Sequence, residues 1–249
     1  MKALIPAAGH GTRFAPWTKL IPKEMLPIGA RPAIALIVDE AIEAGANEVV
    51  IITSPEKPLL KKWFELNPPP VPIAWIDQIE QRGLGHAVLQ AADHFATESE
   101  TVLVLLGDAL VSGGNASKAM KGVSDANGGA SVIGCEAVPL ERVSRYGIMK
   151  GASEISEGFF RLDDIVEKPS IEEAPSRLAV AGRYLLDPAV FGYLKDQTPG
   201  VGGEIQLTDA IRRMLAKKPV FGYIYPGHRH DLGNPQGYLK ALEAMNANG

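Results

Sequence analysis

Short apolar runs alternate with longer amphipathic stretches through the first half of the chain. Four runs rich in β-branched residues cover 3–6, 48–53, 72–76 and 101–106, and helical patterns lie between most of them. Strands that alternate with helices in this way are typical of βαβ units. We therefore predict one large α/β domain with a Rossmann-like, mixed but mostly parallel sheet, flanked by helices.

The clearest helical pattern covers residues 32–45, where Pro32 suits the first turn and Gly45 follows the last. Its apolar stripe consists of Ile34, Ile37, Val38, Ala41 and Ile42. We expect this helix to pack on the sheet and assign it no chemistry.

The pattern changes at about residue 130, after which the apolar runs are shorter and are broken by glycine and proline. We interpret these runs as further strands of mixed direction that widen the same sheet. Two helices should follow, one near 204–218 and one at 235–249 that Asn234 and Pro235 open.

Composition and charge narrow the choice of partners. The 249 residues, 46% of them hydrophobic, can form a sizeable core, and a net charge of -4 gives no general attraction to nucleic acid or to an anionic membrane. The single cysteine, Cys135, has apolar neighbours and should be a buried thiol. Without a signal-like start or a run of about 20 apolar residues, we expect a cytoplasmic protein.

A glycine-rich turn, AGHGTRF, follows the first predicted strand at residues 8–14. Glycines let backbone N–H groups approach phosphate oxygens at this position of an α/β sheet. The dinucleotide pattern G-x-G-x-x-G fails because Phe14 replaces its third glycine, and no P-loop ending follows. Arg13, Lys19 and Lys23 add fixed cations, which favours a nucleoside triphosphate over a merely solvated basic loop.

The segment IPAAGHGTRFAPWTKLIPKEMLPI at 5–28 resembles the N-terminal signature of sugar-1-phosphate nucleotidylyltransferases, particularly the bacterial UTP:glucose-1-phosphate uridylyltransferases. Further motifs of this family follow in order along nearly the whole chain. They are GLGHAV at 83–88, YG at 146–147, VEKP at 166–169, AGRYLL at 181–186, GEIQLTDAI at 203–211 and HDLGN at 230–234.

The resemblance implies a role for each matching residue on the nucleotide side. The implied nucleotide contacts are Ala8, Gly9, Gly11, Thr12, Arg13, Gln78 and Gly83. Arg13 would lie near the phosphates, and Lys23 would neutralise their charge. Gln78 would pair with the uracil edge, because a side-chain amide offers both a donor and an acceptor.

Asp108 follows the apolar run 101–106, where packing gives no reason for an ionised side chain. The resemblance makes Asp108 a ligand of Mg²⁺ together with Asp231. Simple strand termination at Asp108, and a turn or helix entry at Asp231, remain alternatives. His228 and His230 would share a strand face, but H-x-H-D is too short to specify zinc, and magnesium prefers oxygen ligands.

The second half of the chain contains the implied sugar-phosphate site. Glu167 would accept hydrogen bonds from sugar hydroxyls, Lys168 would pair with the sugar phosphate, and the backbone at Gly147 and Gly182 would approach the sugar ring. The alternative for Glu167 and Lys168 is an adjacent pair of solvated charges.

The implied reaction is the Mg²⁺-dependent transfer of UMP from UTP to glucose 1-phosphate, which gives UDP-glucose and pyrophosphate. Arg13, Lys23, Asp108 and Lys168 would form its catalytic set. Residues 1–130 would form the nucleotide-binding half, 131–235 the sugar-phosphate-binding half and 235–249 a terminal helix. The family also implies a homo-oligomer, either a dimer or a tetramer.

The sequence departs from the family in three places, one of which is LLGDAL at 105–110, where LPDV is common. His10 replaces a usual leucine, and 64–75 is shorter than usual, which leaves the oligomer geometry open. No role follows for His10 or His86. The alternatives are the same chemistry with dTTP or another hexose 1-phosphate, a non-catalytic nucleotide-sugar sensor, and a dinucleotide-dependent oxidoreductase.

Overall fold

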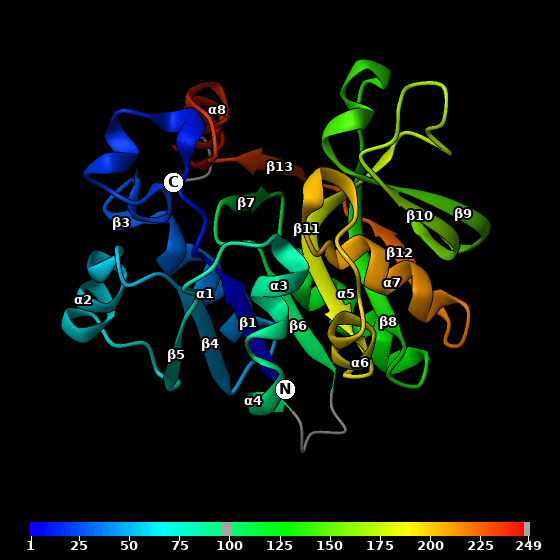
Figure 1. The fold of residues 1–249 in the computed structure, drawn as a ribbon, viewed down its shortest axis with the longest axis horizontal. Helices are drawn as coiled ribbons and strands as arrows, with labels where there is room; N and C mark the ends of the chain where they lie inside the picture. The colour runs from blue at the N-terminus through cyan, green and yellow to red at the C-terminus, as the bar shows by residue number, and fades with distance from the viewer. Residues whose placement is uncertain (96–100, 247–249) are drawn as a thin grey trace.

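The first half of the chain forms four parallel strands at one side of a nine-stranded sheet (Figure 1). The computed structural model describes residues 1–95 and 101–246. In spatial order the four strands are β5 (Ile73–Asp77), β4 (Glu48–Thr53), β1 (Lys2–Pro6) and β6 (Val102–Leu105). Each end lies within one residue of its predicted position, which confirms the four predicted strands.

The second half of the chain extends the sheet with strands of both directions. After β6 they are β11 (Leu178–Leu186), β8 (Ser131–Ala137), β12 (Val220–Ile224), β10 (Phe159–Glu167) and β9 (Gly147–Ser156). The predicted mixed sheet is confirmed, but its parallel share is smaller than expected. In the described part of this sheet four strand pairs are parallel and five antiparallel. One physical reason for the larger antiparallel share is the short turn at Gly158, which has a φ of 70° and connects β9 to β10. So short a connection can join only antiparallel strands.

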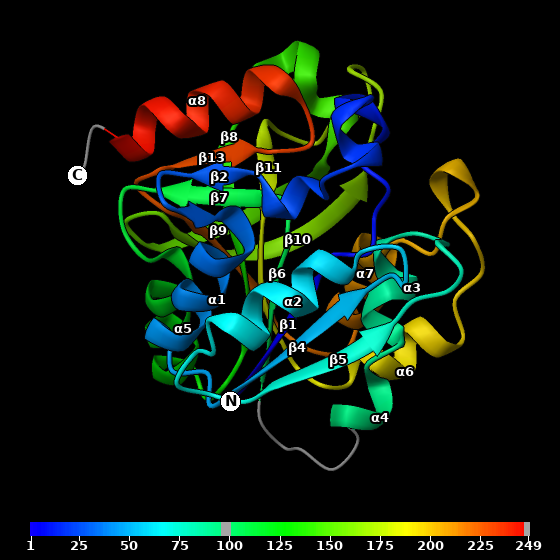
Figure 2. The same ribbon diagram turned by 90° about the vertical axis from the view of Figure 1, so that its left-hand side faces the viewer.

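Helices cover both faces of the sheet (Figure 2). One face packs against α1 (Ala33–Glu43), α2 (Pro58–Leu66) and α5 (Ala116–Ala126), whereas α8 (Pro235–Asn246) lies beyond the sheet against the short strands at 109–112 and 228–231. The other packs against α3 (Leu84–Leu89), α4 (Ala92–Phe95), α6 (Val190–Lys195) and α7 (Leu207–Leu215). The helices predicted from 32, near 204 and from 235 correspond to α1, α7 and α8, although 247–249 lie outside the described residues.

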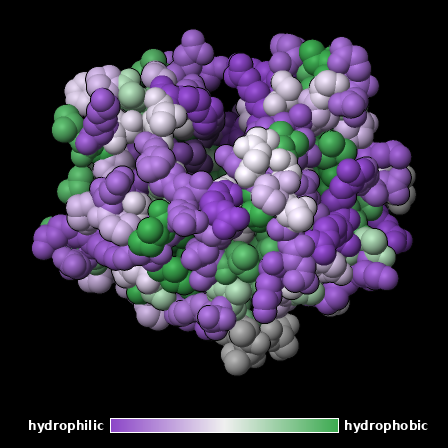
Figure 3. All heavy atoms as spheres, in the orientation of Figure 1, coloured by the Kyte–Doolittle hydropathy of each residue, from purple (hydrophilic) through white to green (hydrophobic). Residues whose placement is uncertain are grey.

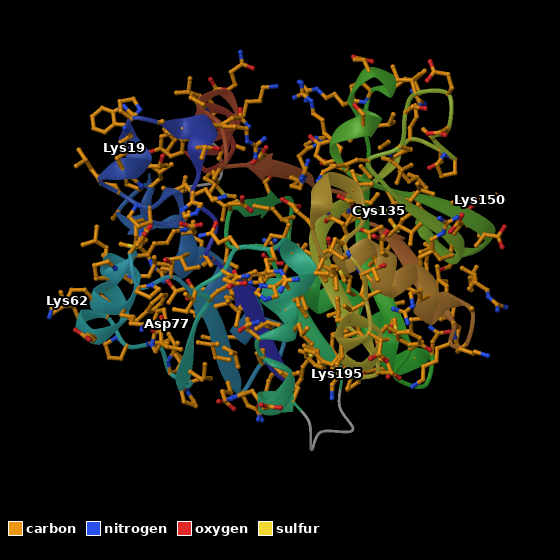
Figure 4. All side chains as sticks on the ribbon, in the orientation of Figure 1. Lys19, Lys62, Asp77, Cys135, Lys150 and Lys195 are labelled. Atoms are coloured by element: carbon orange, nitrogen blue, oxygen red, sulfur yellow. The ribbon has the colours of Figure 1, made fainter. Side chains whose placement is uncertain are left out.

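Alternation along the strands divides the core between the two faces. Ala3 and Ile5 of β1 belong to the cluster under α1, whereas Leu4 belongs to the cluster under α3 and α7. Cys135 of β8 is fully buried, as predicted, and Figure 4 labels it within the second half. Burial and the nearby charge of Glu136 raise the pKa of its thiol far above the usual value, so the residue serves packing.

Short ribbons and turns lie above the carboxyl ends of the parallel strands (Figure 1). They comprise β7 (Ala109–Ser112) paired with β13 (His228–Asp231), β2 (Pro27–Ile28) paired with β3 (Arg31–Pro32), and the 3₁₀ turns η1 (Thr12–Phe14), η2 (Trp17–Lys19), η3 (Lys23–Met25), η4 (Leu140–Arg145) and η5 (Val201–Gly203). None of the helices in the described ranges has the length and apolar character that a membrane crossing requires.

Candidate active site

Two cavities of about 620 and 740 Å³ adjoin at the carboxyl ends of β1 and β6. We call the first, which the glycine-rich turn lines, the N-half cavity, and the second, which β11 and β13 line, the C-half cavity. Both cavities are lined by Arg13, Leu84, Leu106, Asp108 and Glu204. Figure 3 shows a hollow in the upper middle of this face, bordered largely by hydrophilic residues.

The glycine-rich turn is held from behind by a buried lysine. The Nζ of Lys57 donates to the carbonyl oxygens of Ala7 at 2.7 Å and Gly9 at 2.6 Å. The C=O and N–H of a trans peptide point in opposite directions, so the N–H groups of Ala8 and His10 point away from Lys57. Ala8 and His10 both line the N-half cavity. This arrangement presents backbone donors where an anion can be bound.

A buried carboxylate compensates the charge of Lys57. Glu24 accepts from Lys57 Nζ at 3.0 Å with each carboxylate oxygen. Burial lowers the pKa of Lys57 from its usual value despite the attraction of Glu24, and burial likewise raises the pKa of Glu24. Lys57 and Glu24 thus form one buried pair beneath the turn.

The structure brings Asp108 and Asp231 together across the β7–β13 ribbon. Asp231 pairs in register with Ala109, and the N–H of Leu232 donates to the carbonyl of Asp108 at 2.8 Å. Asp108 Oδ2 accepts from Lys23 Nζ at 2.5 Å. Strand termination alone therefore does not explain the Asp108 side chain. Arg13 Nη1 lies 3.7 Å from Asp231 Oδ2. The four charged side chains that the sequence singled out therefore lie side by side.

Asp231 also performs the turn role that the sequence left open. Its Oδ1 accepts from the N–H of Gly233 at 2.8 Å, and its Oδ2 accepts from Asn234 Nδ2 at 3.0 Å. These bonds orient the carboxylate at the entry to α8. The turn role and a role as metal ligand are therefore compatible in one side chain.

Asp108 and Lys23 are both held in their charged forms. Burial alone would raise the pKa of Asp108, but the charge and hydrogen bond of Lys23, with help from Arg13 and Arg229, hold that pKa below its usual value. Burial would lower the pKa of Lys23, but Asp108 and Glu24 outweigh it, so the pKa lies above its usual value. At neutral pH the pair is an ion pair.

The donors present at this point fit a hard divalent cation. Carboxylate oxygens are preferred ligands of Mg²⁺, which is usually held by one or two carboxylates together with substrate phosphates and water. Within residues 1–95 and 101–246, no group of three or more His, Cys, Asp or Glu side chains could hold a metal ion. A cation at Asp108 and Asp231 would thus require further oxygens from a ligand.

The four residues predicted for the sugar phosphate all line the C-half cavity: Gly147, Glu167, Lys168 and Gly182. The Glu167 side chain is only 10% exposed and accepts from Thr208 Oγ1 at 2.7 Å, so Glu167 is not a solvated charge, whereas the Lys168 side chain is 38% exposed. Lys168 lies 3.2 Å from Glu167 and adopts a φ of 46°, a strained conformation for lysine.

Both glycines of the C-half cavity have a structural reason to be glycine. A Cβ at Gly147 would lie 3.0 Å from Thr208 Oγ1 and 3.3 Å from Glu167 Oε2. Gly182 has a φ of 77°, and a Cβ there would lie 3.1 Å from the Leu106 side chain. Larger residues would displace the groups that shape the cavity.

Some residues that the sequence singled out lie elsewhere. The structure does not bring Gly11 or Thr12 to either cavity. Gly11 has a φ of 66°, and a Cβ there would lie 2.9 Å from Thr18 Cγ2, so it shapes the turn into η1. Lys19 is exposed on η2, toward the outer edge in Figure 4, and lines neither cavity.

Other site residues were missed by the sequence reasoning. Arg229 lines the C-half cavity, donates from Nε to Glu136 at 3.1 Å and stacks 4.3 Å from the ring centre of Tyr146. Arg229 and Asp231 are two residues apart on β13 and therefore lie on the same face of the strand. This spacing could have indicated Arg229 from the sequence. His230 points away and lies 2.9 Å from Ser112 Oγ. Lys57 gave no such signal, because a lysine before a helix is usually exposed.

Comparison with known proteins gives consistent matches over the whole chain. The family described as Nucleotidyl transferase matches residues 2–248. The chain is 41% identical to UTP–glucose-1-phosphate uridylyltransferase YngB of Bacillus subtilis, over 96% of this chain and 87% of that protein. It is 39% identical to UTP–glucose-1-phosphate uridylyltransferase 1 of Streptococcus pyogenes serotype M1, over 96% of this chain and 86% of that protein.

Two solved structures have the same fold over nearly their full length. One is a UDP-glucose pyrophosphorylase in complex with UDP-glucose, with a TM-score of 0.90 and 38% identity, covering 100% of this chain and 99% of that chain. The other is a UTP-bound enzyme from Acinetobacter baumannii, with a TM-score of 0.84 and 34% identity, covering 100% of this chain and 94% of that chain.

Proposed function

The chain belongs to the nucleotidyl transferase family, and on that premise we propose that it transfers UMP from UTP to α-D-glucose 1-phosphate. The products are UDP-glucose and pyrophosphate. The observation that carries this proposal is that the N-half and C-half cavities meet at Arg13 and Asp108. Two phosphate-bearing substrates, one in each cavity, would bring their phosphates together at these charged side chains.

In this proposal the N-half cavity binds UTP. The N–H groups held by Lys57 face the nucleotide, Lys23 and Arg13 neutralise phosphate charge, and Gln78 pairs with the base. Mg²⁺, held by Asp108 and Asp231, would supply further charge neutralisation at the α-phosphate when bound. The negative charge that develops during transfer is then surrounded by fixed cations.

The C-half cavity binds glucose 1-phosphate. Glu167 accepts hydrogen bonds from sugar hydroxyls, and Lys168 pairs with the phosphate, whose oxygen attacks the α-phosphorus in line. No general base is required, because a phosphate monoester is already largely ionised near pH 7, with a second pKa of about 6. Catalysis thus depends on alignment and charge stabilisation.

The proposed division of the chain follows from this arrangement. Residues 1–130 supply most of the N-half cavity and 131–235 most of the C-half cavity, although Glu204 lines both cavities. Assembly as a homo-oligomer, a dimer or a tetramer, stays a prediction. Light scattering of the purified protein measures it directly.

The decisive test is pyrophosphate release by the purified protein with Mg²⁺. UTP, dTTP, CTP, ATP and GTP should be compared against glucose 1-phosphate and its galactose, mannose and N-acetylglucosamine counterparts. We expect fastest turnover with UTP and glucose 1-phosphate. A maximum with another pair would overturn the substrate assignment, and UTP binding without turnover would favour a sensor. Thermal protection by NAD would favour an oxidoreductase instead.

Replacing Lys57 by Met should raise the KM for UTP by about 10- to 100-fold, because a misplaced binding group can cost about that much. The KM for glucose 1-phosphate should change far less, since neither Ala7 nor Gly9, whose carbonyls Lys57 binds, lines the C-half cavity. Steady-state kinetics with each substrate varied in turn measures the difference.

The control for this prediction is Lys61→Met, which removes an exposed lysine of α2 that pairs with exposed Asp77. It should leave both KM values unchanged. Because Lys57→Met leaves Glu24 buried without its partner, the double variant Glu24→Gln, Lys57→Met provides a neutral background. Equal increases in both KM values would contradict the positioning role.

A further inference from the structure

Arg229 of β13 has hydrogen-bond donors that the fold does not use. Its Nε donates to Glu136 Oε1 at 3.1 Å, and its backbone N–H donates to Glu136 Oε2 at 3.2 Å. Within residues 1–95 and 101–246, neither Nη group of Arg229 has a hydrogen-bond partner, and neither is fully buried. Since Arg229 lines the C-half cavity, both Nη groups remain free to donate to a ligand there.

The guanidinium of Arg229 is held in one position. The two bonds to Glu136 tie both the backbone and the side chain of Arg229 to β8. The ring of Tyr146 covers the guanidinium, with Arg229 Cζ 4.3 Å from the ring centre, and a cation is attracted to such a ring face. The Arg229 side chain is only 11% exposed. The Nη donors therefore keep a fixed direction without a ligand.

The position of Arg229 along β13 places these donors near the junction of the two cavities. The strand runs between the two halves of the molecule, above the main sheet (Figure 1). Arg229 and Asp231 lie on the same face of β13, about 7 Å apart along the strand. At the junction, Asp231 Oδ2 lies 3.7 Å from Arg13 Nη1. A phosphate that reaches the junction from the C-half cavity would thus come close to Arg229.

A sugar phosphate requires more positive charge than Lys168 alone supplies. Lys168 Nζ lies 3.2 Å from Glu167 Oε1, so Glu167 neutralises part of its charge. A phosphate monoester carries about 1.5 to 2 negative charges near pH 7. The planar fork of a guanidinium can donate two parallel hydrogen bonds to phosphate oxygens. Arg229 has this fork available, because Glu136 occupies only Nε of the side chain.

We propose that Arg229 binds the phosphate of the sugar 1-phosphate through its two Nη groups. Arg229 and Lys168 then share the phosphate, and Glu167 is left to the sugar hydroxyls. This assignment rests on the proposed use of glucose 1-phosphate. Because the phosphate is bound both before and during transfer, Arg229 contributes mainly to the KM for the sugar phosphate and much less to kcat.

Replacing Arg229 by Met should raise the KM for glucose 1-phosphate by about 10- to 100-fold, the effect expected when hydrogen bonds to a charged group are lost. The KM for UTP should change far less, because Arg229 does not line the N-half cavity. Steady-state pyrophosphate release, with each substrate varied in turn, measures both values and kcat. The control is Arg142→Met, which removes an exposed arginine of η4 that lines neither cavity and should change none of them.

A second comparison distinguishes a contact with the phosphate from a contact with a sugar hydroxyl. The monodeoxy counterparts of glucose 1-phosphate each lack one hydroxyl group but retain the phosphate. The factor by which Arg229→Met lowers kcat/KM should be the same for glucose 1-phosphate and for each of these compounds. If the factor disappears with one of them, Arg229 binds the missing hydroxyl and the proposal is wrong.

The design also accounts for a loss of folding. Arg229→Met leaves the Glu136 carboxylate without the Arg229 side chain, so the double variant Glu136→Gln, Arg229→Met provides a neutral background and carries the same expectation. An equal rise in the KM for both substrates, or a fall in kcat with unchanged KM values, would overturn the proposal. Absence of turnover by the unmodified protein would instead refute the proposed function.

Discussion

Asp108→Ala should lower kcat/KM for UTP and glucose 1-phosphate by about 1,000-fold, the size of effect seen when one fixed electrostatic group is removed from an active site. Its carboxylate bonds Lys23 at 2.5 Å and lies at the junction of the two cavities. The variant would lose both a proposed metal ligand and the partner that orients Lys23. Single-turnover kinetics and steady-state pyrophosphate release measure this loss.

The fold should survive the Asp108 substitution. The backbone carbonyl of Asp108 still accepts from Leu232, and Lys23 retains attraction to Glu24 and Asp231. Asp77→Ala is the matched control, because Asp77 is the last residue of a parallel strand, as Asp108 closely follows one, but Asp77 is exposed (Figure 4) and pairs with exposed Lys61. Activity of Asp108→Ala above about one tenth of the unmodified protein would contradict the proposed site.

Arg183→Met should lower the free energy of unfolding by about 3 to 5 kcal/mol, the cost of breaking a buried ion pair from one side. Arg183 is fully buried on β11 and bonds Glu40 of α1 from Nε and Nη2, at 2.8 and 2.7 Å. Nη2 also donates to the carbonyl of Ala109 at 2.8 Å. Among the described residues, the substitution would leave the Glu40 carboxylate with the Ser117 hydroxyl alone as a hydrogen-bond donor. Urea denaturation at neutral pH measures the difference.

Two further variants test whether this loss of stability comes from breaking the buried ion pair or from any change of charge. Arg212→Met removes an exposed partner of Asp164 and should cost at most about 1 kcal/mol. The double variant Glu40→Met, Arg183→Met should recover much of the loss, because no buried charge is left alone. A loss in Arg183→Met no larger than in Arg212→Met would refute the prediction.

The stability that the Arg183–Glu40 pair contributes to the fold should depend on pH. Burial raises the pKa of Glu40, but the charge and hydrogen bonds of Arg183, with those of Ser117, outweigh it and hold the pKa below its usual value. A carboxyl group with a lowered folded-state pKa stabilises the fold above its unfolded pKa of about 4.3. This contribution is lost as the pH falls through the folded-state pKa. The stability gap between the unmodified protein and Arg183→Met should therefore shrink in acid.

Local patterns predicted the elements better than their arrangement. The run 48–53 became β4 without change, because its β-branched residues are buried on both faces. The direction of the later strands was less predictable, since it depends on which strand each run meets, and β8 pairs in parallel with β12 more than 80 residues later. Such pairings follow from the packing of the whole sheet and leave no local mark in the sequence.

The residues of the candidate site also differ in how far the sequence alone could predict them. Asp108 could be predicted, because packing gives no reason for an acid so soon after an apolar strand. Lys57 could not, because its importance comes from carbonyl groups of the turn and from Glu24, which the fold alone brings to it. Arg229 is an intermediate case, since its spacing from Asp231 was visible but the cavity was not.

Adjacent residues of β11 belong to the C-half cavity and to the buried core. Gly182 of β11 lines the cavity while the next residue, Arg183, lies in the core, and the pairing of β11 with β8 is irregular between Val180 and Tyr184. Variant libraries that seek a new ligand preference should therefore leave this part of β11 alone. Thr208 of α7 is a better starting point, because it reaches the same cavity from an element that carries no such buried ion pair.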